Sequence, residues 1–367
     1  KDMEEGACRL STAIRNREKV VIYGDYDVDG TTAVSILYTF LKGFGLDVEY
    51  YIPHRFKEGY GINPDGIQYS IDKKADLIVS VDCGITAIDE ALYAKEKGID
   101  LIICDHHTVG DSIPEAVAVL DPKRPDCSYP FDGLSGAGVG FKLIQGTIKK
   151  LGLGSSLADQ YLDLVSISIA SDIVPIVDEN RIMMRKGLQL INSSPRIGIA
   201  ALLKKVGLKP GLINTSTIVF SLGPRINAAG RMGDATTAVE LMIAESSNEA
   251  HRFAEQLEEI NQKRRDTDIA TTNQATDMLE NDFEIDSLSA MVLHHPDWHL
   301  GVIGIVASRL VDAHYRPAIM LSTVEDKIKG SARSIKGFNI YDALKKCEDL
   351  LEQFGGHEFA AGLTMDK

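Results

Sequence analysis

The chain has 367 residues, of which 44% are hydrophobic and 25% charged, so it is long enough for two domains with a substantial core. No apolar run reaches membrane-spanning length and the start at Lys1 lacks a signal-peptide pattern, so we expect no membrane partner; the missing initiator Met predicts a fragment of a longer protein. The formal net charge of −14 argues at first against a polyanionic partner.

Short β-rich runs alternate with helical patterns through the first half of the chain. We expect strands at residues 20–23, 48–52, 77–81, 101–104 and 116–120. We expect helices at residues 31–43, 63–74, 86–97, 137–150 and 156–171. Near-continuously apolar strands separated by helices are typical of an α/β fold with a parallel sheet covered on both faces, in which ligands gather at the carboxyl ends of the strands.

Three aspartates, Asp25, Asp27 and Asp29, follow the first expected strand at alternate positions. Carboxylates at this spacing repel one another and lose water at the end of a buried strand, and a divalent cation would remove both penalties. The alternatives are a solvated Asp-rich turn, with Gly30 as a helix entry, or a calcium loop. The EF-hand template fails because the residues after Gly30 are apolar and no Glu closes the loop.

Acidic and imidazole groups also follow two other expected strands. Asp82 comes after the third strand, and Asp105, His106 and His107 come after the fourth. Right-handed crossovers bring the carboxyl ends of parallel strands to one edge, so these groups should lie near the three aspartates. Asp172 emerges from an apolar stretch and needs a partner or a metal; a cap on a neighbouring helix is the alternative. The coincidence predicts one site at this edge of the sheet.

Residues 248–281 contain neither Gly nor Pro, which predicts one long connecting helix. A smaller unit should follow, with strands near 289–294 and 317–322 and a helix at 301–313.

Two stretches of this smaller unit fit a phosphate group. Arg333, beside Ser331, offers a guanidinium fork, and Gly355-Gly356-His357 lets backbone approach an anion with His357 as a donor. A surface arginine and a tight turn are the alternative interpretations.

Although the net charge is negative, one long stretch of the chain contains only basic charged residues. Residues 181–231 carry nine basic side chains and neither Asp nor Glu, which predicts a phosphate-facing wall; a basic surface without a partner is the alternative. The cysteine count is odd and no CxxC spacing occurs, which indicates reduced thiols and a cytoplasmic protein. The five cysteines are Cys8, Cys83, Cys104, Cys127 and Cys347.

The expected ligands are hard oxygen atoms with one or two imidazoles, a set that suits manganese or magnesium better than zinc. Four or five carboxylates exceed the needs of one ion, whereas two ions about 3.5–4 Å apart account for them and are a known arrangement for phosphate-ester hydrolysis. The second imidazole of His106-His107 cannot easily reach the same ion as the first. It is better used to donate to the phosphate or to protonate the leaving group.

With these residues in place, the chain resembles the DHH phosphoesterase superfamily, and within it the branch of 5′ to 3′ exonucleases specific for single strands. The motifs that carry the resemblance lie at residues 24–30 (GDYDVDG), 81–84 (VDCG), 105–107 (DHH), 171–175 (SDIVP), 223–232 (GPRINAAGRM) and 355–362 (GGHEFAAG). The resemblance implies a parallel-sheet DHH domain at residues 1–247, a long helix at 248–282 and a smaller α/β DHH-associated domain at 283–367.

The resemblance also implies roles for the site residues. Asp27 and Asp82, with Asp25, would hold one metal. The second would be held by Asp29, Asp82, His106 and Asp172, with Asp82 bridging the pair and His107 acting on the phosphate. Ser331, Arg333, Gly355, Gly356 and His357 would bind the nucleotide phosphate, and Arg225 and Arg231 would lie along the path of the strand.

Two features of the chain differ from sequence patterns of the superfamily. Relatives that act on small substrates are similar to one another in having His four residues before the position of Asp27. This chain has Tyr23 there, and the difference favours the exonuclease branch. The chain also stops five residues after Gly362, where exonucleases of this branch continue into an OB-fold; without it we expect a weaker grip on longer DNA.

The resemblance therefore implies a metal-dependent exonuclease that degrades single-stranded DNA from the 5′ end to 5′-mononucleotides in DNA repair and recombination. Two divalent ions, Mn²⁺ or Mg²⁺, would be its cofactors. Single-stranded DNA would be its partner, with a single-strand-binding protein or a helicase as further candidates. One alternative is a phosphodiesterase for short oligonucleotides or cyclic dinucleotides. Another is a non-catalytic replication scaffold, against which the intact set of ligands counts.

Overall fold

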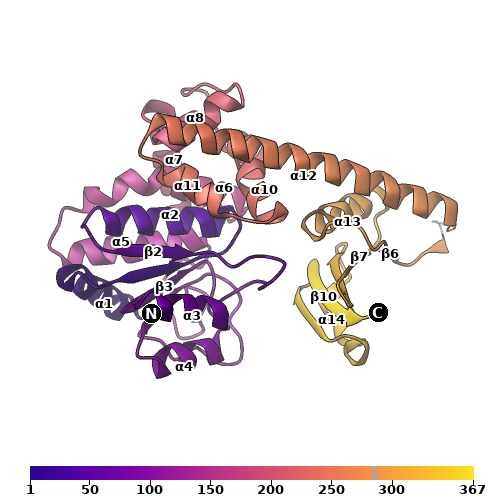
Figure 1. The fold of residues 1–367 in the computed structure, drawn as a ribbon, viewed down its shortest axis with the longest axis horizontal. Coiled ribbons are helices and arrows are strands. Elements are labelled where there is room, and N and C mark those ends of the chain that lie inside the picture. The colour runs from indigo at the N-terminus through magenta and orange to yellow at the C-terminus, as the bar shows by residue number, and fades with distance from the viewer. Residues whose placement is uncertain (283, 285–286) are drawn as a thin grey trace. The chain divides into compact units, whose positions relative to one another are not determined.

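The computed structural model describes residues 1–282, 284 and 287–367, and these form two compact units, Lys1–Glu259 and Ile260–Lys367 (Figure 1). The predicted domain boundary at residue 283 lies outside the described residues, and the predicted domain limits stay a prediction. None of the described helices is long and apolar enough to cross a membrane.

The first unit is built on a five-stranded sheet in the order β2-β1-β3-β4-β5, with every pairing parallel. This confirms the predicted parallel α/β sheet. β1 is wholly buried because its apolar, mainly β-branched residues face a core on each side. The strands are β1 (Val20–Tyr23), β2 (Val48–Tyr51), β3 (Leu77–Val81), β4 (Asp100–Cys104) and β5 (Ala118–Leu120).

Alternate residues of β1 face two different cores. Val20 and Ile22 belong to the larger core, which is shared with α1 (Met3–Asn16) and with three helices drawn above the sheet in Figure 1. Val21 and Tyr23 belong to the smaller core under the sheet. The three upper helices are α2 (Val28–Lys42), α5 (Gly136–Lys150) and α6 (Leu162–Ser171), and the lower ones are α3 (Pro64–Asp72) and α4 (Ile88–Glu96).

Two predicted helices are corrected by the structure. The first begins at Val28 rather than residue 31, because the Asp27 side chain accepts from the Gly30 amide and caps the helix. The helix predicted at 156–171 is a 3₁₀ segment, η1 (Ser155–Tyr161), followed by α6. Gly152, Gly154, Ser155 and Ser156 lie at the start of this stretch, and these poor helix formers disfavour an α-helix there.

The remainder of the first unit is helical and includes a short π-helix. Its elements are α7 (Asp178–Ser193), α8 (Ile197–Lys205), α9 (Thr215–Thr217), the π-helix η2 (Ile218–Leu222), α10 (Gly223–Met232) and α11 (Thr236–Ile243). The long helix α12 (Ser247–Asp282) continues from the first unit into the second.

The second unit contains a mixed sheet in the order β6-β7-β8-β10-β9. One of its cores packs α13 and the last part of α12 against β6 and β7. Its elements are β6 (Met291–His294), α13 (Leu300–His314), β7 (Ala318–Val324), β8 (Lys327–Arg333), α14 (Ile340–Lys345), η4 (Glu348–Leu350), β9 (Gln353–His357) and β10 (Ala360–Asp366).

Candidate metal centre

The segment that follows β1 is held by close backbone packing. A Cβ atom on Gly30 would lie 2.4 Å from the Asp25 carbonyl oxygen, so only glycine fits there. The Asp25 and Asp29 side chains are 4% and 1% exposed, respectively. The GDYDVDG stretch is therefore a compact turn that carries acids into the protein interior, and the solvated Asp-rich turn does not describe it.

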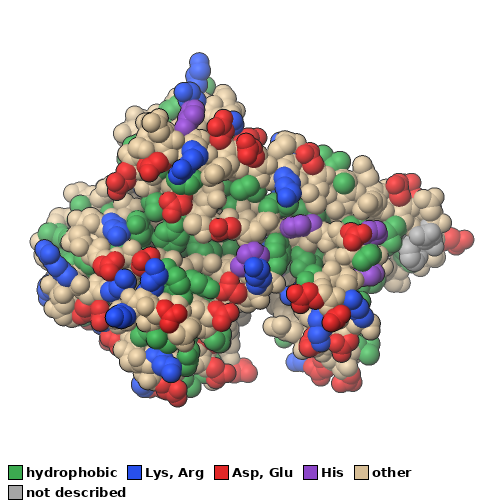
Figure 2. Space-filling model, viewed as in Figure 1, with side chains coloured by type: hydrophobic (Ala, Val, Ile, Leu, Met, Phe, Trp, Pro, Cys, Tyr) green, Lys and Arg blue, Asp and Glu red, His purple; other side chains and the backbone are tan. Residues whose placement is uncertain are grey.

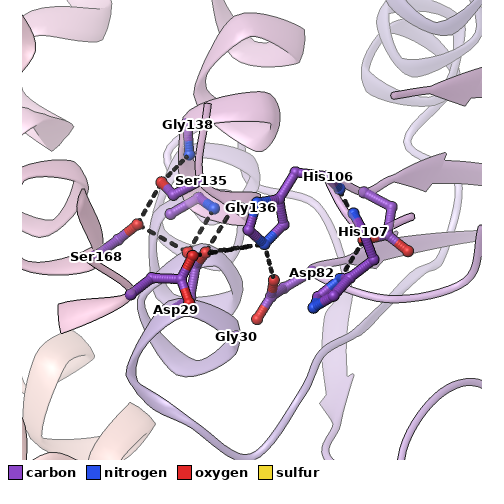
Figure 3. Close-up of polar contacts among 12 residues, drawn as sticks. Asp29, Gly30, Asp82, His106, His107, Ser135, Gly136, Gly138 and Ser168 are labelled. Atoms are coloured by element: carbon purple, nitrogen blue, oxygen red, sulfur yellow. Dashed lines mark hydrogen bonds and ion pairs between the residues drawn. The ribbon is translucent and has the colours of Figure 1, made fainter. Parts of the chain in front are cut away.

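The Asp29 carboxylate is fixed by the start of α5 and by α6, as Figure 3 shows. Its oxygens accept from the amides of Gly136 at 2.6 Å and Ala137 at 2.8 Å and from the Ser168 hydroxyl at 2.7 Å. A carboxylate is favoured at a helix N-terminus because the amides there have no intrahelical partner. These contacts hold Asp29 in place while one of its oxygens still faces His106.

His106 stands among three of the predicted metal-ligating acids. Its Nε2 atom lies 3.1 Å from Asp82 Oδ1, 3.6 Å from Asp29 Oδ2 and 3.7 Å from Asp172 Oδ2. A Cβ atom on Gly136 would lie 2.5 Å from Asp82 Oδ1, so the α5 terminus packs directly on this carboxylate. The acids that follow separate strands and helices thus meet around one imidazole.

The structure brings together every predicted metal-ligating residue. Ligand atoms lie within 4.8 Å of one another in three sets. The sets are Asp25, Asp27 and Asp82; Asp29, His106 and Asp172; and Asp82, His106 and His107. Asp82 and His106 each belong to two sets, which fits a pair of ions with a shared ligand.

Unsatisfied buried atoms support the same fit. Within the described part of the chain, Asp25 Oδ1, Asp82 Oδ1 and both ring nitrogens of His106 are buried without a hydrogen-bond partner. Leaving such atoms unpaired is costly, and a cation would satisfy them. Their carboxylate and imidazole chemistry suits a manganese- or magnesium-sized hard ion.

The electrostatics of the centre favour a bound cation. Burial, followed by the charges of neighbouring aspartates, raises the pKa values of Asp25, Asp27 and Asp82. Burial and then Asp29 raise the pKa of Asp172 to about 8. Burial lowers the pKa of His106, so the protein alone favours a neutral imidazole there, as a metal ligand requires.

These raised pKa values predict that the metal-free protein loses stability as pH rises. An acid with a raised folded pKa binds its proton more tightly when folded, so its contribution is present at low pH and is lost through the folded pKa. The contribution of Asp172 is lost between its unfolded pKa and its folded pKa of about 8. Over this range the free energy of unfolding falls by up to about 1.4 kcal/mol per pH unit. We expect the melting temperature in EDTA to fall between pH 5.5 and 8.

Calorimetry with and without Mn²⁺ checks this expectation. Mn²⁺ should reduce the fall, and Asp172→Asn should flatten it in EDTA because the titrating carboxyl is gone. A melting temperature in EDTA that is constant or rises over this pH range would contradict the raised pKa values.

His107 has a different environment from His106. Asp105 Oδ1 lies 2.7 Å from His107 Nδ1, and Asp105 also accepts from the amides of Ile85 and His106. Burial lowers the pKa of His107, but the hydrogen bond and charge of Asp105 outweigh it and raise the value to about 9. His107 is thus held as a cationic donor, which suits contact with a phosphate.

The predicted strand-path arginines have structural contacts. Arg225 donates to Glu258 of α12 and, at 2.7 Å, to the Ser221 carbonyl. Arg231 lies close enough to Tyr26 for its charge to lower the pKa of that phenol, although burial raises it overall. Neither contact tests a role toward DNA, and that role stays a prediction.

Helix α10 also braces the aspartate turn. Asn227 Oδ1 accepts from the Val28 amide at 3.1 Å, and a Cβ atom on Gly230 would lie 2.2 Å from the Tyr26 carbonyl oxygen. The GPRINAAGRM motif therefore supports the aspartate turn through its Asn and second Gly.

The acid-free stretch 181–231 is partly neutralised by acids from the rest of the first unit. Acids from outside it pair with four of its basic side chains, and acidic and basic groups are interspersed over the face of the first unit drawn in Figure 2. The pairs are Lys186–Asp159, Arg196–Asp163, Lys205–Glu255 and Arg225–Glu258. The folded charge pattern depends on partners distant in sequence.

The predicted phosphate-binding residues of the second unit lie in register across three strands. Ala360 of β10 pairs with Arg333 on one side and His357 on the other, and Gly362 pairs likewise with Ser331 and Gly355. The stretch considered as a tight turn is therefore strand β9.

Close packing supports two of these positions. Gly356 has φ 147°, and a Cβ atom there would lie 2.3 Å from the Ala360 carbonyl oxygen, so glycine is required. Arg333 donates to Ser331 Oγ at 3.0 Å, and its guanidinium packs against Gly304 of α13, where a Cβ atom would lie 2.8 Å from Nη2.

Several supporting residues were missed from the sequence. Asp105 was visible as part of the DHH motif, but its partner could not be named. Gly136 lies in the glycine-rich run at residues 133–140, a signal of close packing at a helix start. Ser168 and Asn227 carried no local signal.

Comparisons with known proteins cover both units. The DHH family N-terminal domain matches residues 19–169, and the DHHA1 domain matches residues 286–367. The single-stranded-DNA-specific exonuclease RecJ of Bacillus subtilis is 43% identical over 367 residues, which are 100% of this chain and 46% of that protein. The chain thus spans about half the length of this relative.

Solved structures are similar over the whole chain. A crystal structure of exonuclease RecJ bound to manganese has a TM-score of 0.87 and 34% identity, and covers 100% of this chain and 90% of the other. RecJ from Thermus thermophilus in complex with Mg²⁺ has a TM-score of 0.79 and 30% identity over 100% of this chain and 50% of the other.

Proposed function

Because the chain belongs to the RecJ family of DHH-domain proteins, we propose that it hydrolyses phosphodiester bonds of single-stranded DNA from the 5′ end and releases 5′-mononucleotides. The observation that carries the proposal is the convergence of Asp25, Asp27, Asp29 and Asp172 around Asp82 and His106. The RecJ structures with bound manganese and magnesium support the same metals for this site.

We assign the ligands in two groups that share Asp82. Asp25, Asp27 and Asp82 would hold one ion, and Asp29, Asp82, His106 and Asp172 would hold the other. When bound, such a pair supplies Lewis-acid catalysis and lowers the pKa of a water molecule to near neutrality.

The chain's own residues perform the remaining tasks. His107, held by Asp105, donates a proton to the phosphate or to the leaving oxygen. The α5 terminus fixes Asp29 and so maintains the spacing of the ligand groups. Ser331, Arg333, Gly355, Gly356 and His357 would bind the terminal phosphate, and Arg225 and Arg231 would follow the strand.

Partners and location follow from the same proposal. A single-strand-binding protein or a helicase would supply the single strands in DNA repair and recombination. The five cysteines are free, which supports a reducing, cytoplasmic location.

A digestion assay with strands of increasing length tests the proposed substrate and polarity. Oligonucleotides labelled at the 5′ or the 3′ end are incubated with Mn²⁺ or EDTA. We expect a 5′ label to appear at once as a mononucleotide, a 3′ label to pass through a ladder, and EDTA to stop both. A 5′-label ladder would overturn the polarity, and activity confined to the shortest strands or to cyclic dinucleotides would favour a small-substrate phosphodiesterase.

A further inference from the structure

Tyr60 lies in the connection between β2 and α3 and is flanked by two glycines in left-handed conformations. Gly59 has φ 85° and Gly61 has φ 93°, values that residues other than glycine rarely adopt. The connection is anchored around Tyr60, because Glu58 accepts from the Tyr51 hydroxyl and the Gly61 carbonyl accepts from the Tyr23 hydroxyl at 2.9 Å. The loop therefore presents Tyr60 in a defined direction.

The Tyr60 hydroxyl joins two parts of the metal centre. It donates to the Asp82 carbonyl at 3.0 Å and lies 2.9 Å from His107 Nδ1. Its one hydrogen is used on Asp82, and the hydrogen of His107 Nδ1 is used on Asp105. The Tyr60 oxygen also lies 3.4 Å from His107 Nε2, so the hydroxyl lies against the face of the imidazole ring. The two rings meet edge to face, with centroids 5.4 Å apart.

Both partners of this hydroxyl need support. Asp82 has φ 62°, a left-handed conformation that is strained for aspartate. His107 Nδ1 donates its hydrogen bond within its own motif, to Asp105 Oδ1. A single hydrogen bond leaves an imidazole free to rotate about that bond, whereas the Tyr60 hydroxyl, which comes from another loop, lies against the ring and limits this rotation.

We propose that Tyr60 is a positioning residue that orients His107 toward the substrate phosphate and fixes it to the backbone of Asp82. The proposal rests on the proposed function, in which His107 is the donor. Tyr60 as a whole is 50% exposed while its hydroxyl makes these contacts, so replacing it with Phe keeps the ring and its exposed face and removes only the hydroxyl.

Kinetics of Tyr60→Phe test the proposal. We expect kcat for a short single strand to fall by about 10–100-fold, the range seen when residues that orient site ligands are lost, with KM unchanged. On a His107→Ala background, the same change should lower kcat by a clearly smaller factor, because no imidazole remains to be oriented. Tyr51→Phe is the matched control, since it removes a loop-anchoring hydroxyl that does not contact His107.

Histidine-ring ¹H–¹⁵N spectra of the metal-free protein give a readout independent of activity. The His107 ring signals should shift in Tyr60→Phe and stay in place in Tyr51→Phe. Unchanged His107 signals, or an equal loss of kcat on both backgrounds, would overturn the positioning role. An inactive wild-type protein with Mn²⁺ would instead refute the proposed function, while the spectra would still report on the Tyr60–His107 contact.

Discussion

Asp82→Asn should lower kcat/KM for single-stranded DNA by at least about 10³-fold, or about 4 kcal/mol of transition-state stabilisation. Asp82 belongs to two of the three sets of possible ligands, and its Oδ1 atom is buried without a hydrogen-bond partner. The neutral amide keeps the shape of the carboxylate but removes the charge that would be shared by two ions. Calorimetric titration should show that the same variant also binds Mn²⁺ more weakly.

In the absence of metal, Asp82→Asn should be more stable than the wild type. Burial and four neighbouring aspartates raise the pKa of Asp82, so replacing it with an uncharged side chain should raise the melting temperature in EDTA at pH 8. This separates loss of function from loss of folding. Asp76→Asn is the matched control, because Asp76 precedes β3 as Asp82 follows it, and it is exposed. Comparable losses in the two variants, or full activity of Asp82→Asn, would refute the shared-ligand assignment.

The sheet and its acidic edge were predictable because their signals are local. β1 and β3 were expected with the bounds that the structure shows, since each is a short apolar run ended by an acid. Once the strands were known to be parallel, the rules of connection alone brought Asp25, Asp82 and His106 to one edge. This is why the candidate metal ligands could be named without any knowledge of tertiary contacts.

The residues that support those ligands were not predictable in the same way. Asp29 depends on Gly136 and Ser168, which lie more than 100 residues away in the chain, and on the angle at which α5 meets the turn. The pairing of Arg225 with Glu258 likewise arises only when α12 packs on the first unit. Composition and spacing show which charges exist but not which of them neutralise one another.

His107→Ala should reduce kcat by about 10²–10⁴-fold while Mn²⁺ binding is largely retained. His106→Ala should weaken Mn²⁺ binding, because its Nε2 atom lies within 3.1–3.7 Å of three acids. The two neighbouring imidazoles differ because Asp105 raises the pKa of His107 to about 9, whereas burial lowers the pKa of His106. We therefore expect the main defect of His106→Ala in Mn²⁺ binding and that of His107→Ala in kcat.

The comparison is made by pairing Mn²⁺ titration calorimetry with single-turnover digestion at saturating metal. Extra Mn²⁺ should restore part of the activity of His106→Ala, because its defect lies in metal affinity, and none of that of His107→Ala. His251→Ala, an exposed histidine of α12, should match the wild type in both measurements. If His107→Ala lost Mn²⁺ binding as severely as His106→Ala, His107 would be a ligand of the ions. The set Asp82, His106 and His107, whose atoms also lie within 4.8 Å, would then describe the centre better than the division into two acid-rich groups.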